Sequence, residues 1–168
     1  MNKKKAAFTL LEMIITMAIT ITVLSIAGSM FTTGNKVFSD SDVKSTLQIE
    51  GQAIQEKISD IGMQGITIIS TNDNSLIIQS YVKDDDTPRY FKIQQDGNKL
   101  IINKDKDDSS CANVNNNMII SEDLESLKMT PSNGNKSMDF DIKLTKKKGF
   151  SNVSQEITFT INFRNKIN

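Results

Sequence analysis

Residues 1–33, MNKKKAAFTLLEMIITMAITITVLSIAGSMFTT, decide the fold of this chain. Three lysines at positions 3–5 form a basic head, and the 26 residues Phe8–Thr33 carry a single formal charge, Glu12. A helix of ~20 apolar residues crosses a hydrocarbon core of ~30 Å, so this stretch predicts a membrane span. Because short lysine-rich flanks resist translocation, we expect a single-pass protein with its amino terminus inside and the residues after about Asn35 outside.

A plain anchor or a cleaved signal peptide would also begin this way. The small residues of SIAGS, at 25–29, form a candidate signal-peptidase site with a cut after Ala27. Glu12 argues against both interpretations, because it lies only four residues into the apolar run. A carboxylate inside a membrane costs a few kcal/mol unless it has a partner, and such charges usually serve a function.

Residues 4–12, KKAAFTLLE, resemble the class III leader of type IV prepilins and type II secretion pseudopilins. The resemblance implies that prepilin peptidase cuts between Ala7 and Phe8 on the cytoplasmic side and methylates the new amino terminus of Phe8. One residue departs from the family pattern, because Ala7 stands where glycine is usual. Alanine is the side chain nearest to glycine in size, so we expect slower processing rather than failure.

The resemblance also gives Glu12 a role in assembly. It implies that the Glu12 carboxylate meets the positive amino terminus of Phe8 on a neighbouring subunit and so sets the axial register between subunits. The partners implied are prepilin peptidase, other pilin subunits, the assembly platform with its ATPase, and membrane lipid before assembly.

After Thr33 the apolar residues follow one face of a helix. Val43, Leu47, Ile54, Ile58 and Ile61 recur at helical spacing. We therefore predict one continuous spine helix from Phe8 to about Ile61, roughly 80 Å long, which Gly62 and Gly65 bring to an end.

Beyond the helix, the hydrophobic period changes to about two, which predicts antiparallel strands. The fold class is therefore α+β, a spine helix packed on an antiparallel β-sheet head as in type IV pilins. The domains are a leader (1–7), a transmembrane half-helix (8–33), an amphipathic half-helix (34–62) and a head (63–168). The expected strands are Ile66–Ser70, Ser75–Lys83, Arg89–Gln94, Lys99–Asn103, Glu125–Thr130, Met138–Thr145 and Gln155–Arg164, with polar loops at Asp84–Thr87, Lys104–Asn117 and Pro131–Ser137.

Composition argues against an enzyme. The 168 residues include no histidine and a single cysteine, Cys111, which we place in a polar loop and which has no partner for an intrachain disulfide. No pairing of a nucleophile with a base, no glycine-rich phosphate loop and no metal-ligand spacing is present in the sequence, so we assign no catalytic residues and no metal site. Without the three leader lysines, the chain has 17 basic and 20 acidic side chains, so its net charge gives no general attraction to nucleic acid.

Two charged stretches could carry a site, and we favour solvated loops for both. Asp84–Asp86 and Asp105–Asp108 could supply oxygen ligands to calcium, yet neither has the ligand spacing of an EF-hand. Lys146–Lys148, with Gly149 and Phe150, place three positive charges and an aromatic ring in an expected hairpin loop, where they could contact DNA phosphates.

The sequence as a whole predicts a minor pilin or pseudopilin, closest to the W-type minor pilins or J-type pseudopilins. Such a subunit waits in the membrane and is then drawn into a surface pilus or a pseudopilus. Two alternatives stay open: a major pilin of the same system, and an unrelated extracellular binding domain tethered by one membrane helix.

Overall fold

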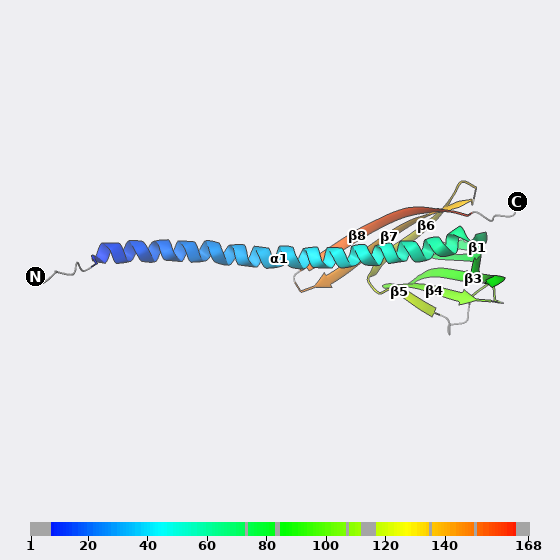
Figure 1. Ribbon diagram of the computed structural model, residues 1–168, viewed down its shortest axis with the longest axis horizontal. Coiled ribbons are helices and arrows are strands. Elements are labelled where there is room, and N and C mark those ends of the chain that lie inside the picture. Colours follow the sequence, from blue (N-terminus) through cyan, green and yellow to red (C-terminus); the bar gives the residue numbers. More distant parts are fainter. Residues whose placement is uncertain are drawn as a thin grey trace, which may run out of the picture.

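The computed structural model of the 168-residue chain describes residues 8–72, 74–82, 85–106, 108–111, 117–134, 136–149 and 151–163. One helix, α1 (Leu10–Met63), runs unbroken for 54 residues and projects far beyond a β-rich head (Figure 1). The predicted spine helix is confirmed. The leader, 1–7, lies outside the described residues.

The two halves of α1 have different surroundings. Large apolar side chains in the first half are exposed, whereas the predicted stripe in the second half is buried against the head. A half-helix that is apolar all round needs lipid or other helices around it, and a striped half-helix needs one packed face. The buried stripe consists of Val43, Leu47, Gly51, Ile54, Ile58, Ile61 and Gly62.

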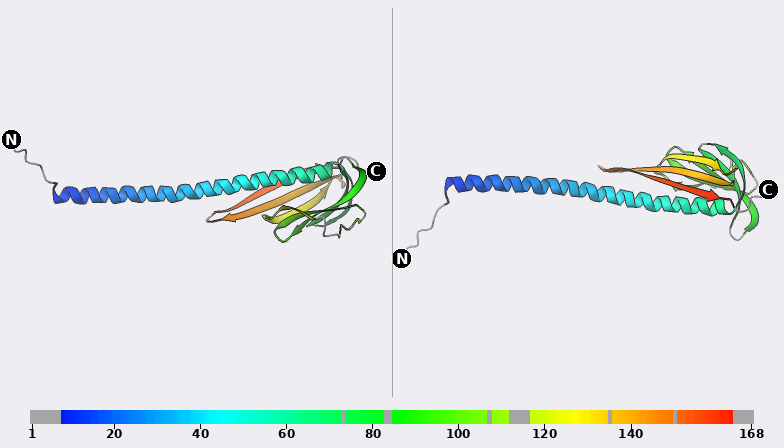
Figure 2. Two further views of the ribbon diagram at one scale, coloured as in Figure 1. Left: turned by 60° about the horizontal axis from the view of Figure 1, so that its bottom comes forward. Right: turned by 90° about the horizontal axis from the view of Figure 1, so that it is seen from above.

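The head contains two antiparallel sheets rather than one (Figure 2). A five-stranded sheet has the order β1-β2-β3-β4-β5, and a three-stranded sheet has the order β6-β7-β8. Strands β7 and β8 form a long hairpin that runs back alongside α1 (Figure 1). The strands are β1 (Gly65–Asn72), β2 (Ser75–Val82), β3 (Asp85–Asp96), β4 (Lys99–Asp105), β5 (Asn117–Ser121), β6 (Leu124–Ser132), β7 (Ser137–Lys148) and β8 (Ser151–Asn162).

The core lies where α1 meets the inner faces of both sheets. Ile54 and Ile58 of the helix are fully buried, as are Ile93 of β3 and Leu144 of β7. The rings of Phe140 and Phe159 stack with centroids 5.0 Å apart and planes 9° apart, which joins β7 to β8. Alternation along β7, which predicted one buried face, is confirmed by its burial pattern.

Each of the three predicted polar loops overlaps a strand. The Asp84–Thr87 loop overlaps β3, which begins at Asp85, Lys104–Asn117 overlaps the end of β4 and the start of β5, and part of Pro131–Ser137 belongs to β6 and β7. Strand β5 (Asn117–Ser121) was missed because its sequence, NMIIS, does not alternate between polar and apolar residues. Lys146–Lys148 were expected in a hairpin loop, but they form the end of β7.

The glycines at the end of α1 act through close packing rather than through a left-handed backbone. Gln64 caps the helix at φ −96°, and Gly65 is already the first residue of β1, so the predicted glycine C-cap was wrong. A Cβ built on Gly62 would lie 2.5 Å from Cγ2 of Ile161, a buried strand residue. Gly62 therefore lets the helix approach β8 closely.

Two glycine-to-alanine substitutions in α1 are expected to change stability in opposite directions. Gly62→Ala is expected to destabilise the head by about 1–3 kcal/mol, since the buried Ile161 has no room to move. Gly34→Ala, with no atom within 4 Å of the added Cβ, is expected to stabilise α1 by ~1 kcal/mol through helix propensity. Thermal melting of each variant in detergent micelles checks both, and a Gly62→Ala head as stable as the wild type would contradict the contact.

Candidate assembly site at the start of the helix

The first turn of α1 is closed by a reciprocal cap between Thr9 and Glu12. The Thr9 hydroxyl oxygen accepts a hydrogen bond from the Glu12 backbone N–H at 3.3 Å, and Glu12 Oε2 accepts one from the Thr9 backbone N–H at 2.8 Å. The Thr9 hydroxyl also donates to the same carboxylate oxygen at 3.0 Å. This is a capping box, which satisfies backbone donors that the first turn of a helix leaves open.

The sequence analysis missed this cap, although threonine followed three residues later by glutamate is its usual signal. Glu12 consequently has a local structural role besides the one that the resemblance implies. Its bonds within the described residues all use Oε2, so Oε1 remains available to a group from outside the chain.

Phe8 is the described residue that precedes the cap. Its side chain is 80% exposed, and it lies just before the first helical turn. A cut before Phe8 would therefore create a positive amino group one residue from the Thr9 cap, at the end of the helix where Glu12 also lies. Ala7, the other side of the predicted cut, is outside the described residues.

The apolar surface behind this end is long and uncovered. In the part of the chain that the structure describes, α1 is the one helix long and apolar enough to cross a membrane, and none of its most apolar window is buried. An exposed apolar surface of this size marks a contact with lipid or with other protein. It includes Leu11, Ile15, Ile19, Val23, Ile26 and Phe31.

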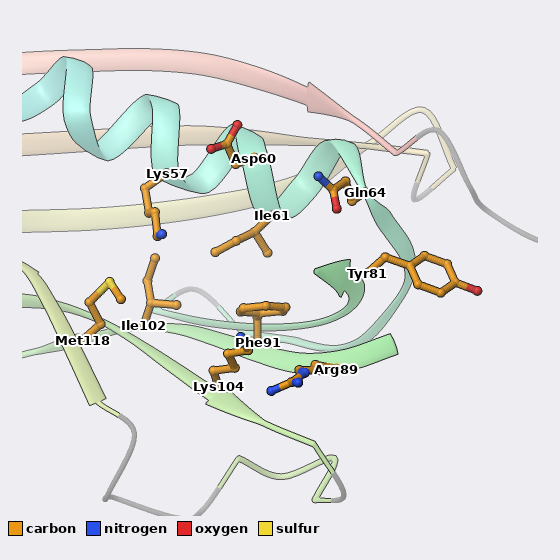
Figure 3. Close-up of a pocket in the computed structure, with 10 residues that line it drawn as sticks. All are labelled: Lys57, Asp60, Ile61, Gln64, Tyr81, Arg89, Phe91, Ile102, Lys104 and Met118. Atoms are coloured by element: carbon orange, nitrogen blue, oxygen red, sulfur yellow. The ribbon is translucent and has the colours of Figure 1, made fainter. Parts of the chain in front are cut away.

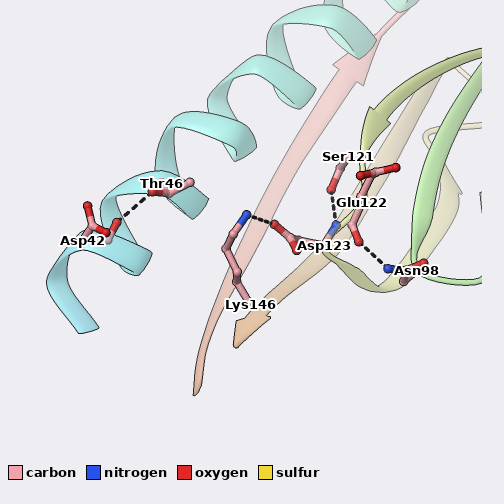
Figure 4. Close-up of polar contacts among 7 residues, drawn as sticks. All are labelled: Asp42, Thr46, Asn98, Ser121, Glu122, Asp123 and Lys146. Atoms are coloured by element: carbon pink, nitrogen blue, oxygen red, sulfur yellow. Dashed lines mark hydrogen bonds and ion pairs between the residues drawn. The ribbon is translucent and has the colours of Figure 1, made fainter. Parts of the chain in front are cut away.

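The lysines at the end of β7 have partners on other elements. The Lys146 ammonium forms an ion pair with Asp123, just before β6 (Figure 4). Lys148 Nζ lies 2.8 Å from a carboxylate oxygen of Asp42 on α1. The hydrogen bond to Asp123 raises the pKa of Lys146, and the hydrogen bond from Lys148 lowers the pKa of Asp42. Two of the three lysines thus hold the hairpin in place, which weakens their case as a DNA-contacting patch.

The same end of the hairpin is tied to the helix by neutral groups. The hydroxyl oxygens of Ser151 and Ser39 lie 2.8 Å apart, next to the ion pair of Lys148 with Asp42. Together these contacts mark where the head begins along α1, at Ser39, six positions beyond Thr33, the predicted end of the membrane span. Phe150, which was grouped with the lysines, is outside the described residues.

The acidic stretches show no assembled metal site in the described residues. Asp105 Oδ1 accepts a hydrogen bond from the Asp108 backbone N–H at 3.1 Å, and Asp108 in turn accepts bonds from Ser110. No three His, Cys, Asp or Glu side chains gather there in a way that could hold a metal ion. Asp84 and Asp107 lie outside the described residues, as do the side chains of Asp85 and Asp86, so calcium binding by these stretches stays a hypothesis.

Cys111 lies between β4 and β5, as predicted for a loop residue, and its side chain is buried. It is 1% exposed and has a left-handed φ of 48°. Burial, together with the negative charges of Asp105 and Asp108, raises the pKa of its thiol. The thiol is therefore held in its neutral form and acts as a small core side chain.

Comparison with known proteins identifies the amino-terminal segment. Residues 2–28 match the family described as the prokaryotic N-terminal methylation motif. The motif is characteristic of type IV prepilin-like pilins and pseudopilins, which are structural proteins rather than enzymes, and it implies processing by prepilin peptidase and assembly with other pilins. No curated protein and no solved structure matches the chain at a significant level.

Proposed function

We propose that this chain is a minor pilin or pseudopilin, a structural subunit of a membrane-anchored fibre. One observation carries the proposal: the methylation motif, 2–28, begins a 54-residue helix whose first half is apolar and uncovered while its second half supports a β-rich head. Such a helix can exchange lipid for neighbouring helices without any change in the head.

The chain would act in three stages. It first spans the membrane once, with the head outside. Prepilin peptidase then removes residues 1–7 and methylates Phe8. Finally, the assembly platform and its ATPase move the subunit into the fibre, where the apolar half of α1 packs against other subunits.

The geometry of the cap supports a register role for Glu12. In the single subunit, Oε2 closes the helix start while Oε1 is open, so the carboxylate can accept from a second donor without breaking the cap. The new amino group of Phe8 on a neighbouring subunit is such a donor, and charge-assisted hydrogen bonds are about twice as strong as neutral ones. Satisfying both charges inside an apolar helix bundle would select one axial offset between subunits.

Two features favour a minor over a major subunit. The head consists of eight strands in the described residues, and no proline precedes Pro88, so α1 lacks the proline kink that many major pilins have. The abundance of the chain in sheared fibres distinguishes these two roles, because a major subunit dominates that fraction.

Amino-terminal sequencing combined with mass spectrometry of the mature protein tests the proposal directly. We expect a chain that begins at methylated Phe8. A chain that retains Met1, or that begins after Ala27, would instead support an unrelated membrane-tethered binding domain.

The residue before the cut provides a second test. Ala7→Gly is expected to keep or increase the rate of processing, whereas Ala7→Arg is expected to block it, because a long charged side chain does not fit beside the cut within the peptidase. The gel shift that accompanies loss of the leader measures both rates. Normal maturation of Ala7→Arg would show that the cut lies elsewhere.

A further inference from the structure

A recess of about 690 Å³ opens between the end of α1 and the inner face of the five-stranded sheet (Figure 3). Its size falls within the range of ligand sites, roughly 300–1,000 Å³. Neither the predicted membrane span nor the capped start of the helix contributes to it. Its lining comes from α1 (Lys57, Asp60, Ile61), the residue after it (Gln64), β2 (Tyr81), β3 (Arg89, Phe91), β4 (Ile102, Lys104) and β5 (Met118).

The recess combines an apolar floor with a mainly positive lining. Ile61, Phe91 and Ile102 form the floor, and Figure 3 shows Lys57 reaching from the helix toward Met118 and Ile102 on the sheet. Among the described residues that line it, Lys57, Arg89 and Lys104 are basic and Asp60 is acidic. Asp60 points away from the sheet in the same view. A ligand with an apolar body and negative charge complements this lining.

One side of the recess is an edge strand that carries no charge and no proline. In the part of the chain that the structure describes, β5 pairs only with β4, so its other backbone edge has no strand beside it. Edge strands are normally shielded by charges, prolines or bulges. The sequence of β5, NMIIS, contains no charge and no proline, and its pairing with β4 is irregular at one point, between Ile119 and Ser121. Its two central apolar side chains are half exposed, Met118 at 50% and Ile119 at 49%.

The two faces of β5 differ. Met118 lines the recess, and Ile120, at the register shift of the strand, packs against the core. Ile119 points to the opposite face of the sheet and does not line the recess. A strand added beside β5 would therefore place every second side chain in the recess, next to Met118 and below Lys57.

We propose that β5 and this recess bind an extended peptide segment of a partner protein, one in which acidic and apolar side chains alternate. Backbone hydrogen bonds to β5 would supply affinity, and the inward side chains would supply specificity through the floor and Lys57. A peptide is favoured over an acidic glycan because the floor is made mostly of aliphatic side chains and the site borders an open strand edge. The inference needs only the head and does not depend on fibre assembly.

The experiment uses the full chain in phosphatidylcholine nanodiscs and a short acetylated, amidated peptide of alternating glutamate and valine. A neutral fluorophore on the peptide reports binding by fluorescence anisotropy. Met118→Glu and Lys57→Glu each place a negative charge in the recess and are expected to weaken binding about tenfold. Their matched controls, Ile119→Glu on the other face of β5 and Lys44→Glu on α1 outside the recess, are expected to leave Kd unchanged within about twofold.

Two modified peptides test the strand pairing. Methylating the backbone nitrogens of alternate residues removes donors from one edge of the peptide, so one of the two alternate patterns is expected to abolish binding while the other is tolerated. A peptide with glutamine in place of glutamate is expected to bind about tenfold more weakly.

Several results would overturn the proposal. These are binding that does not saturate, equal affinity for the glutamine peptide, equal effects of Met118→Glu and Ile119→Glu, or equal effects of both methylation patterns. Tighter binding of an oligogalacturonate than of the peptide would reassign the recess to an acidic glycan. If the wild-type chain does not bind the peptide but its mature form begins at methylated Phe8, this inference is rejected and the proposed fibre role stands.

Discussion

Ile58→Asp is expected to unfold the head. Ile58 has no exposed surface and belongs to the stripe that α1 presents to the core between it and both sheets. Losing an isoleucine from the core removes ~1.5–3 kcal/mol of burial, and an unpaired carboxylate in its place adds a desolvation penalty of several kcal/mol. The sum is comparable to the whole stability of a domain, which is about 5–15 kcal/mol.

The measurement is cooperative thermal melting of a chain from Val37 onward, which we expect to be a soluble monomeric domain without the apolar half-helix. Along α1, the polar contacts with the strands of the head begin at Ser39 and the buried residues begin at Val43, so this fragment keeps them. Ile49→Asp is the matched control, because Ile49 is on the same helix, is 66% exposed and should tolerate the same substitution. If the Ile58→Asp domain melts as cooperatively as the Ile49→Asp domain, the packing of the spine helix on the head is wrong.

Most of the architecture could be predicted from residue periodicity. The run from Phe8 is apolar on all sides of the helix, whereas the stripe that ends at Ile61 is apolar on one side. This difference predicted correctly which half of α1 is uncovered and which half packs on the head. Strands β7 and β8 were predictable because Phe140 and Phe159 belong to clear alternating patterns. Local patterns suffice wherever one face of an element is buried and the other is wet.

Features that depend on distant partners could not be predicted. The role of Gly62 follows from Ile161, and the role of Lys148 follows from Asp42, 106 positions away in the sequence. Strand β5 has apolar residues on both faces, which removes the alternation that identifies a strand. The division of the head into two sheets likewise arises from the packing around α1 and not from any strand alone.

The candidate site rests on local sequence patterns. The resemblance marked Ala7, Phe8 and Glu12 from their order in the sequence; the family match over residues 2–28 covers these positions, and their individual roles stay predictions. Glu12 also closes its own helix through Thr9, a role that was not predicted although its local signal, threonine followed three residues later by glutamate, is present in the sequence. Any test of Glu12 must therefore separate a local effect on the helix from an effect on assembly.

Replacing Glu12 by leucine is expected to separate membrane insertion from fibre assembly. Insertion should be as good as in the wild type or better, because the one charge in the apolar run is removed. Cleavage after Ala7 should continue. In the fibre, the positive amino group of Phe8 on the adjoining subunit would lose its partner, and an unpaired buried charge costs about 3–5 kcal/mol. Since 1.4 kcal/mol corresponds to a factor of ten, we expect at least about a tenfold loss of the chain from surface fibres or of the fibres that it initiates.

Thr9→Ala is the control that isolates the cap. It removes the hydroxyl that accepts from the Glu12 backbone N–H but keeps the carboxylate, and loss of an N-cap costs ~1 kcal/mol. We expect Thr9→Ala to enter fibres nearly as well as the wild type, since packed neighbours support the helix. The comparison requires membrane and sheared-fibre fractions of all three proteins and a count of fibres per cell. Equal depletion of Thr9→Ala and Glu12→Leu would assign Glu12 to helix capping alone, and normal incorporation of Glu12→Leu would show that its carboxylate does not set the register between subunits.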